Sequence, residues 1–381
     1  MGWRRQPLGV AVLYNVSACL IKGEPRDLLA EQGVTVCAEA VGQALRAGGY
    51  RVAQVPVHMD VELALEPYPP TDWLVFNLGE GLEGRLFEEP RIVWALEAMG
   101  YCFTGSSGDA IARSVHKARA KDLFARHGVP TPSWWFFRHP DDVDALREHL
   151  VFPLIVKPVA EDASIGVGPH AVVNDLPSLR DRVAYVVERY RQAALAEIFI
   201  AGREFNVALW GDPPQVLPLA EIDFGAFEDP YTRIVSFAAK WEETSFEYHN
   251  TPVLCPAQIG EGVAERIAHT ARRAWDAVGC CGYARVDMRL GAGDLPYVVE
   301  VNCNPDLSPE AGFHHAARVA GYSYEQMVLN IVDIASRHPN VYDHGGSCGR
   351  WTSYPQYDGH GRHLHARGVD VRRGDLVHVS R

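Results

Sequence analysis

The chain has 381 residues, of which 47% are hydrophobic and 22% charged; this composition is typical of a globular protein and excludes a disordered chain. The formal net charge of −12 argues against a nucleic-acid surface, and no apolar run approaches the ~20 residues that a membrane helix needs. The eight cysteines form no CxxC pair, so we expect reduced thiols and a cytoplasmic location.

The segment 1–103 alternates between strand and helix patterns. Apolar runs predict strands, and stripes of apolar residues that end at glycine predict helices. The predicted strands are Val10–Tyr14, Arg51–Val57, Trp73–Asn77 and Tyr101–Phe103, and the predicted helices are Val36–Ala47 and Glu89–Met99. This order favours a parallel sheet covered by helices, so we expect an N-terminal α/β lobe over residues 1–103.

The rest of the chain has longer helices and a less regular order. Helices are predicted at Lys117–His127, Leu179–Ala194, Glu261–Val278 and Tyr324–Ser336, and strands at Phe152–Lys157, within Glu197–Trp210, at Tyr283–Leu290 and at Tyr297–Asn302. The stretch Phe224–Pro256 is rich in aromatic residues and proline but has weak periodicity, so we expect mostly loop there.

Residues 341–381 differ in composition and are interpreted as an appendage. The final residues could form a hairpin. The histidines of this segment complete no recognised ligand spacing with a cysteine: His344, His360, His363, His365 and His378. We therefore favour a packed hairpin over a transition-metal site.

The segment ARVDMRLGAGDLPYVVEVNCNP is the most informative part of the sequence. Both flanks alternate with a period of two around a glycine-rich centre, which indicates a β-hairpin. A turn centred on Gly293–Asp294 places Asp287 opposite Glu300 and, one step further, Arg285 opposite Asn302. All four side chains then point to the same face.

Two facing carboxylates destabilise a sheet unless another group offsets their charge. A divalent cation does this, and Mg²⁺ is usually held by one or two carboxylates together with substrate phosphates. The alternative is a solvated face with cross-strand ion pairs. A register slip of one residue would separate the carboxylates, so the metal hypothesis depends on the register.

Lys157 ends an apolar strand, and the small-residue segment EDASIGVG follows it. Backbone N–H groups in such a segment can approach a phosphate closely. The segment is neither a Walker A motif nor a GxGxxG fingerprint, and an ordinary hairpin loop is an alternative. Lys117 opens a predicted helix, where a lysine is by itself typical of a solvated charge.

Together these segments resemble the ATP-grasp superfamily, most closely its D-alanine–D-alanine ligase-like branch. The matches lie in family order over about residues 8–335: NLGEG, YCFTGS, the K-x-x-x-K of Lys117 and Lys121, FPLIVKP, EDASIGV, EIFIAGREFNV, AAKW, CPAQ, GYARVDM and EVNCNP. The resemblance implies a three-lobed α/β and α+β fold, in which the lobes 104–198 and 199–340 clasp ATP beside the N-terminal parallel-sheet lobe.

The resemblance also implies roles for residues around the phosphates. Lys117 and Lys157 would contact the phosphates of ATP, and Ser164 would lie in a flexible lid over them. Lys240 would reach the terminal phosphates. Arg285 would stabilise charge at the reacting centre.

The remaining implied roles concern the nucleoside and the metal. Glu197 and Ile200 would meet adenine through backbone groups of the linker between two lobes, and Glu204 would hydrogen-bond the ribose. The ligands of Mg²⁺, or alternatively of Mn²⁺, would be Asp287, Glu300 and Asn302.

The implied activity is that of an ATP-dependent carboxylate–amine ligase. A carboxylate attacks the γ-phosphoryl group to form an acylphosphate, and an amine then displaces phosphate. The protein supplies positioning and charge neutralisation and needs no nucleophilic side chain. The expected partners are a small-molecule carboxylate and an amine, with no nucleic acid and no membrane; a homodimer is compatible with the sequence.

The substrate half of the sequence departs from the ligase pattern. Where the ligases carry a lid serine and a later tyrosine, this chain has Ala163 and Trp241. Where they continue after the metal strand with a glycine and serines, this chain has a segment with Asp306 and Glu310. These acids would repel the free carboxylate of a second D-alanine and favour a cationic partner, so we expect substrates other than two D-alanines.

Three alternatives stay open at this point. The chain could be a D-alanine–D-alanine ligase with divergent contacts, or an inactive nucleotide-binding scaffold. The two acids could face solvent or pair with Arg318 instead of meeting a substrate. The glutamate that the ligases carry near the first strand has two candidates, Glu24 and Glu31.

Overall fold

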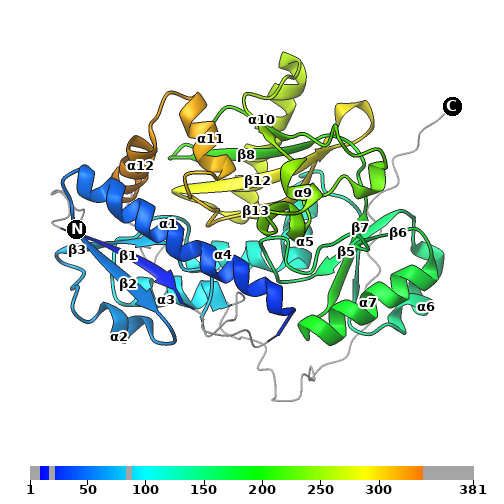
Figure 1. Ribbon diagram of the computed structural model, residues 1–381, viewed down its shortest axis with the longest axis horizontal. Coiled ribbons are helices and arrows are strands. Elements are labelled where there is room, and N and C mark those ends of the chain that lie inside the picture. The colour runs from blue at the N-terminus through cyan, green and yellow to red at the C-terminus, as the bar shows by residue number, and fades with distance from the viewer. Residues whose placement is uncertain (1–8, 17–21, 83–87, 338–381) are drawn as a thin grey trace. The chain divides into compact units, whose positions relative to one another are not determined.

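The computed structural model of the chain describes residues 9–16, 22–82 and 88–337 (Figure 1). The appendage 341–381, with its histidines and expected hairpin, lies outside these residues. The N-terminal lobe contains a parallel sheet of three strands in the order β2–β1–β3, as predicted. The strands are β1 (Gly9–Asn15), β2 (Arg51–Val57) and β3 (Trp73–Asn77). The central strand β1 is almost entirely buried, which explains its uninterrupted apolar run.

Five helices accompany this sheet in the chain: α1 (Leu28–Ala47), α2 (Val61–Leu65), α3 (Glu89–Ala98), α4 (Gly108–Val115) and α5 (Lys117–Arg126). Helix α1 begins well before the predicted Val36. The prediction began too late because Gly33 interrupts the helical pattern of the sequence. A Cβ at Gly33 would lie 3.0 Å from the Trp241 ring. The expected strand Tyr101–Phe103 is wrong, since only a single bridge joins Phe103 to Val75.

A second, antiparallel sheet has four strands in the order β4–β7–β5–β6. Its strands are β4 (Trp134–Phe137), β5 (Leu154–Pro158), β6 (Val172–Val173) and β7 (Ala194–Ile198), and its helices are α6 (Asp142–Leu146) and α7 (Leu176–Tyr190). The helix predicted to reach Ala194 ends at Tyr190, because Arg191 adopts a left-handed φ of 52°. Ala194 instead begins β7.

The third sheet has six strands, with β11–β10–β8–β12–β13 in order and β9 paired to β8. The strands are β8 (Glu204–Trp210), β9 (Gln215–Val216), β10 (Ala220–Ile222), β11 (Val253–Leu254), β12 (Tyr283–Leu290) and β13 (Pro296–Asn302). The predicted strand region Glu197–Trp210 is therefore divided between two sheets by the linker 199–203. The expected loop Phe224–Pro256 contains two short α-helices, one 3₁₀ helix and one short strand.

The helices of this part of the chain are α8 (Phe237–Trp241), α9 (Phe246–His249), α10 (Glu261–Val278), α11 (Gly312–Val319) and α12 (Tyr324–Arg337). Short 3₁₀ helices occur at Pro25–Asp27, Arg147–His149, Pro230–Thr232 and Ala292–Asp294. None of the helices in the described part of the chain is long and apolar enough to span a membrane.

Two apolar cores join the N-terminal sheet to the six-stranded sheet, whereas the four-stranded sheet packs on α7 through a core of its own. Val286 and Met288 of β12 are fully buried in the first core. Residues of β12 that alternate with them must point to the opposite face of the sheet. That face carries the polar residues of the candidate site. The expected domain boundaries after residues 103, 198 and 340 stay predictions.

Candidate functional site

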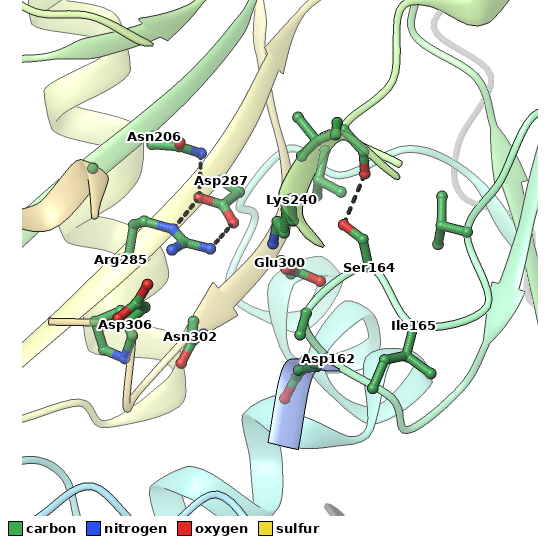
Figure 2. Close-up of a pocket in the computed structure, with 18 of the residues that line it drawn as sticks. Asp162, Ser164, Ile165, Asn206, Lys240, Arg285, Asp287, Glu300, Asn302 and Asp306 are labelled. Atoms are coloured by element: carbon green, nitrogen blue, oxygen red, sulfur yellow. Dashed lines mark hydrogen bonds and ion pairs between the residues drawn. The ribbon is translucent and has the colours of Figure 1, made fainter. Parts of the chain in front are cut away.

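A cavity of about 590 Å³ is lined by α1 of the N-terminal lobe, by β5 with the loop after it, and by β8, β12 and β13 (Figure 2). Every site residue expected from the sequence lines this cavity: Lys117, Lys157, Ser164, Glu197, Ile200, Glu204, Lys240, Arg285, Asp287, Glu300 and Asn302. The structure thus brings together residues that are far apart in the chain. Their roles toward a ligand are taken up below as proposals.

The hairpin places its polar residues as the alternation predicts. Asp287 on β12 is paired with Glu300 on β13, and Arg285 with Asn302. The turn itself differs from the prediction: it is centred on Gly293 within a 3₁₀ turn and not on the pair Gly293–Asp294. A register shift between Asp287 and Met288 compensates for this difference of one residue.

Val299 is the additional residue of that β-bulge, because Met288 pairs with Val298 and Asp287 with Glu300. Neighbouring residues of a regular strand point to opposite faces, but a bulge relaxes this rule. Val299 and Glu300 accordingly both line the cavity, while Val298 is buried in the core. The bulge therefore aims the Glu300 carboxylate at the site.

Arg285 holds Asp287 through two parallel hydrogen bonds of 2.8 Å, from Nε to Oδ1 and from Nη2 to Oδ2 (Figure 2). Asn206, directly opposite Asp287 on β8, donates its side-chain Nδ2 to Oδ1 at 2.7 Å. Burial alone would lower the pKa of Arg285, but Asp287 raises it above its usual value. The guanidinium therefore stays charged at the floor of the cavity.

Lys117, the first residue of α5, is buried and not solvated. Its Nζ donates to the Glu161 carbonyl and lies 3.4 Å from Asp162 Oδ1 and 3.7 Å from Glu300 Oε2. Burial would lower the pKa of Lys117, but Asp162 and Glu300 raise it. An ammonium group is thus held between the loop after β5 and the hairpin.

Lys240 on α8 makes no hydrogen bond or ion pair with the part of the chain that the structure describes. Its ammonium faces Glu300 in the cavity (Figure 2). Burial, and next the charge of Arg285, lower the pKa of Lys240 below its usual value. Lys240 is therefore placed to receive an anion.

Lys157 is fixed by Glu197, whose Oε1 lies 2.7 Å from Lys157 Nζ, while Oε2 pairs with Lys121. Lys121 also donates to Thr131 Oγ1 at 2.9 Å and is completely buried. Burial would raise the pKa of Glu197, but Lys121 and Lys157 lower it. The Glu197 side chain is thus occupied in positioning a lysine, and only its backbone is left for a ligand.

The field of these cations acts most strongly on Glu300. Burial would raise the pKa of its carboxyl group, but Lys117, Lys157, Lys240 and Arg285 lower it to about 2. Glu300 is therefore an anion at neutral pH and a suitable ligand for a hard cation.

The donor set of the hairpin fits a magnesium ion shared with a substrate. Asp287 and Glu300 offer carboxylate oxygens, and Asn302 offers an amide oxygen on the same face. Within residues 9–16, 22–82 and 88–337, no three His, Cys, Asp or Glu side chains gather as they would around a metal held by protein alone. Two carboxylates supplemented by substrate phosphates are the usual arrangement for Mg²⁺.

The loop after β5 is tied to the segment that leads into α8. Ser164 Oγ donates to the Val235 carbonyl at 2.7 Å, and Phe237 N donates to the Val167 carbonyl at 2.9 Å. Trp241 Nε1 donates to the Ala163 carbonyl at 3.0 Å, so the indole at the family's tyrosine position contacts the residue at its serine position. The loop is thereby closed over the lysines.

Ile200 and Glu204 lie on the linker between the two antiparallel sheets and at the start of β8. Arg289 of β12 donates to the Ile200 carbonyl at 2.6 Å and to Glu204 Oε2 at 2.9 Å. Arg289 lines the same cavity and is buried.

The segment after β13 supplies two further carboxylates to the cavity wall. Asp306 and Glu310 both line the cavity and are exposed to solvent. Asp306 accepts hydrogen bonds from Ser308 N at 2.8 Å and Ser308 Oγ at 3.0 Å, and it lies beside Arg285 in Figure 2. Neither acid forms an ion pair with Arg318 in the described part of the chain.

Several site residues escaped the sequence prediction. Asn206 and Arg289 have a signal, because they alternate with Glu204 and Asp287 on their strands. Asp162 and Glu89 have none, since Asp162 lies within the irregular loop after β5 and Glu89 is the first residue of α3. Glu89 is buried at the start of α3 and lines the cavity; burial and next Asp162 raise the pKa of its carboxyl group well above the usual value.

Comparison with known proteins agrees with this geometry. The family model described as the D-ala D-ala ligase C-terminus matches residues 123–333, which is more than half of the chain. The chain belongs to the D-alanine–D-alanine ligase family. As a member of this family it is an ATP-grasp ligase, an enzyme that forms carbon–nitrogen bonds. All the expected site residues of this family member except Lys117 lie within the matched range.

Three curated relatives show the level of similarity. An uncharacterised protein of Sinorhizobium fredii, y4sG, is 35% identical over 71% of this chain and 77% of its own length. The D-alanine–D-alanine ligase of Desulforudis audaxviator is 32% identical over 81% of this chain and 94% of its own length. The D-alanine–D-alanine ligase of Bordetella petrii is 31% identical over 67% of this chain and 74% of its own length.

Solved structures of ligase-family members share the fold. The D-alanine–D-alanine ligase of Bacillus anthracis complexed with ATP has a TM-score of 0.64 at 20% identity, over 86% of this chain and 97% of that one. The VanG D-Ala:D-Ser ligase of Enterococcus faecalis has a TM-score of 0.66 at 20% identity, over 87% of this chain and 100% of that one. The expected three-lobed ATP-grasp architecture is confirmed.

Proposed function

We propose that this enzyme is an ATP-dependent carboxylate–amine ligase that forms an amide bond through an acylphosphate and releases ADP and phosphate. The observation that carries the proposal is the arrangement of Asp287 and Glu300, which face each other beside Arg285 and meet the ammonium groups of Lys117 and Lys240 in one cavity. Anionic ligands for a metal and cationic ligands for phosphates are the two requirements of phosphoryl transfer.

In the first step, an oxygen of the acid substrate attacks the γ-phosphorus of ATP, and the bond to the β,γ-bridging oxygen breaks. Lys117, Lys157 and Lys240 would neutralise the phosphate charge during this transfer, and Glu197 keeps Lys157 in place. Bound Mg²⁺, held by Asp287, Glu300 and Asn302, would supply further neutralisation of the phosphate oxygens. The products of this step are an acylphosphate and ADP.

In the second step, the nitrogen lone pair of an amine attacks the acyl carbon and phosphate leaves with the bonding electrons. The proton that the nitrogen loses is taken up by the departing phosphate. Arg285 would stabilise the oxygen that becomes negative at the acyl carbon. Ser164 and its loop would exclude water, which would otherwise hydrolyse the acylphosphate. The contacts of this loop with Val235 and Trp241 support that role.

The linker would bind the nucleoside. We propose that backbone groups of Glu197 and Ile200 contact adenine and that Glu204 hydrogen-bonds the ribose. All three residues line the cavity. Glu204 pairs with Arg289 near one end of β12, whereas Asn302, from which the chain continues to Asp306, pairs with Arg285 toward the other end. This separation leaves the region around Arg285 and Asp306 for the two other substrates.

The two substrates are proposed to differ from a pair of D-alanines. Asp306 and Glu310 bring negative charge to the wall near Arg285, which disfavours an acceptor with a free carboxylate and favours a cationic amine. The α1 side of the cavity is formed by small, uncharged side chains: Ala30, Gly33, Val34 and Cys37. Such a wall suits an apolar part of a substrate.

A D-alanine–D-alanine ligase with divergent contacts is the second candidate. It is favoured by the names of the relatives from Desulforudis audaxviator and Bordetella petrii. An inactive nucleotide-binding scaffold is the third, and it is disfavoured because the complete set of hairpin residues is present and oriented into the cavity.

The deciding experiment measures ADP release from ATP against a panel of carboxylic acids and amines, with mass spectrometry of the products. The proposal predicts turnover that requires both an acid and an amine. D-alanine, when it has to serve as both substrates, should support little turnover. Efficient formation of D-alanyl-D-alanine would establish the second candidate. ATP binding without turnover under any combination would favour the scaffold.

A further inference from the structure

Arg289 lines the cavity beside Ile200 and Glu204, and no role for it follows from the ligase chemistry above. It lies four residues after Arg285 on β12, and the register places it directly opposite Glu204 of β8. Its side chain is only 7% exposed. A buried guanidinium needs a partner for its charge and for its hydrogen-bond donors, so its contacts define what it can do.

These contacts join three separate segments of the chain. The guanidinium donates from Nε to Glu204 Oε2 at 2.9 Å, from Nη1 to the Ile200 carbonyl at 2.6 Å, and from Nη2 to the Arg233 carbonyl. The linker, the start of β8 and the loop after β10 are therefore held by one side chain. A lysine could not make these three contacts at once, because its donors radiate from a single atom.

Two aromatic rings enclose the same guanidinium. Its carbon Cζ lies 5.0 Å from the ring centroid of Phe199 and 5.6 Å from that of Phe224. Phe224 contacts Phe227 edge to face, and Phe227 contacts Phe246 of α9 in the same way. The aromatic-rich segment Phe224–Pro256 thus packs against the linker through Arg289, which gives this segment a function at the nucleotide end of the site.

The orientation of Glu204 follows from this arrangement. Arg289 engages only Oε2, and Oε1 receives no hydrogen bond from the part of the chain that the structure describes. Glu204 lines the cavity. One carboxylate oxygen is consequently fixed by the protein, and the other is left to accept hydrogen bonds from a ligand.

We propose that Arg289 is a positioning residue for the nucleotide: it fixes the linker and orients the Glu204 carboxylate so that Oε1 accepts from the ribose hydroxyl groups of ATP. This inference rests on the proposed function, because it assumes that the cavity binds ATP. It goes beyond that function by making ribose recognition depend on a residue that does not touch the ribose.

The test compares the binding of ADP and of 2′,3′-dideoxy-ADP to the full chain by calorimetry in the presence of Mg²⁺. The wild type is expected to prefer ADP by about tenfold or more, as a charge-assisted hydrogen bond allows. Arg289→Met is expected to reduce this preference to about twofold, because Glu204 loses its orientation. Glu204→Gln should reduce the preference for ADP by a similar factor. Combining Arg289→Met with Glu204→Gln should reduce it little further than either substitution alone.

Arg203→Met is the matched control. Arg203 also forms a two-pronged pair with a glutamate of the same sheet, Glu221, and stacks on Phe205, but neither member of the pair lines the cavity. This variant should keep the full preference for ADP. If Arg289→Met does not fold, Arg289→Lys carries the same comparison, with a reduced preference expected.

The outcomes separate the two levels of the proposal. A preference for ADP that is unchanged in the Arg289 variants, or a loss of affinity that is equal for both ligands, overturns the positioning role. A wild type that binds both ligands equally also overturns it but leaves the ATP site intact. A wild type that binds neither ligand overturns the proposed function itself.

Discussion

Asp287 and Glu300 lie directly opposite each other on β12 and β13, yet their carboxylates have different surroundings. Both oxygens of Asp287 accept from Arg285, whereas Lys117 Nζ lies 3.7 Å from Glu300 Oε2. Asp287 is thus paired within the protein, and Glu300 faces cations that would themselves bind phosphates. Within the described residues, Glu300 forms no short ion pair comparable to that of Asp287 with Arg285, so a metal ion could bind Glu300 and Asp287 without displacing one.

The lowered pKa of Lys240 predicts how ATP use depends on pH. A lysine whose pKa lies below the usual value loses its charge earlier as the pH rises. The value of kcat/KM for ATP should therefore begin to fall at a lower pH than an ordinary lysine would impose, since this ratio reports groups of the free enzyme. In Lys240→Arg the charge persists, so the fall should move to higher pH. If kcat/KM for ATP fell at the same pH in the wild type and in Lys240→Arg, this role of Lys240 would be contradicted.

Glu197 should contribute to stability through its two lysines. Breaking a buried ion pair by removing one partner costs about 3–5 kcal/mol, so Glu197→Gln should lower the free energy of unfolding by roughly that amount at pH 7. Glu188 on α7 is exposed, and Glu188→Gln is a control that should change little. Urea unfolding of both variants measures the difference; equal stability of the two would contradict the assignment.

The same residue gives a pH dependence whose sign can be stated. The pKa of Glu197 is lowered in the folded protein, so its stabilisation is fully present above the usual carboxyl range. It is lost as the pH falls through that range toward the lower, folded-state pKa. The stability difference between wild type and Glu197→Gln should therefore shrink on acidification below about pH 4.5.

Trp241 should control how often the loop 162–167 opens. Trp241→Phe keeps an aromatic ring at this position but removes the hydrogen bond to the Ala163 carbonyl. A hydrogen bond of about 1 kcal/mol predicts roughly a fivefold increase in the KM for ATP. Hydrogen exchange of the loop amides should quicken in parallel, and unchanged protection of these amides would show that the indole does not hold the loop.

Asp306 should influence the choice of amine. Asp306→Asn removes a negative charge from the wall near Arg285, so the ratio of kcat/KM for a cationic amine to that for a neutral amine should fall. The exposure of this carboxylate limits the expected change to about fivefold. An unaltered ratio, measured by ADP release with both amines, would place Asp306 outside the acceptor site.

Local alternation predicted the centre of the site only with the help of a compensating irregularity. Asp287 and Glu300 share a hairpin, and the turn differs from the expected one by half a pair step, so that regular pairing would place Asp287 opposite Val299. The bulge at Val299, which was not foreseen, restores the expected pairing with Glu300. Arg289 could have been included, because it continues the alternation of Arg285 and Asp287. Its partners could not, since the Ile200 and Arg233 carbonyls belong to loops without a pattern.

Contacts between distant segments account for the other omissions. The buried pair of Lys121 and Glu197 joins a helix to a strand of the four-stranded sheet, and no local pattern reports such a pair. Helix α4 begins where glycine and serine suggest a loop; it forms because Ser107 accepts a hydrogen bond from Ala110 N. The early start of α1 was hidden by Gly33, whose small size makes room for Trp241.

The central claim is that the facing carboxylates hold a magnesium ion together with a nucleotide. Calorimetry of ADP binding with and without Mg²⁺ tests it most directly, on wild type, Glu300→Gln and the control Glu310→Gln, an exposed acid of the same cavity. Mg²⁺ should strengthen ADP binding to wild type and control by about tenfold or more and should have little effect on Glu300→Gln. An equal effect of Mg²⁺ on all three proteins would contradict the claim.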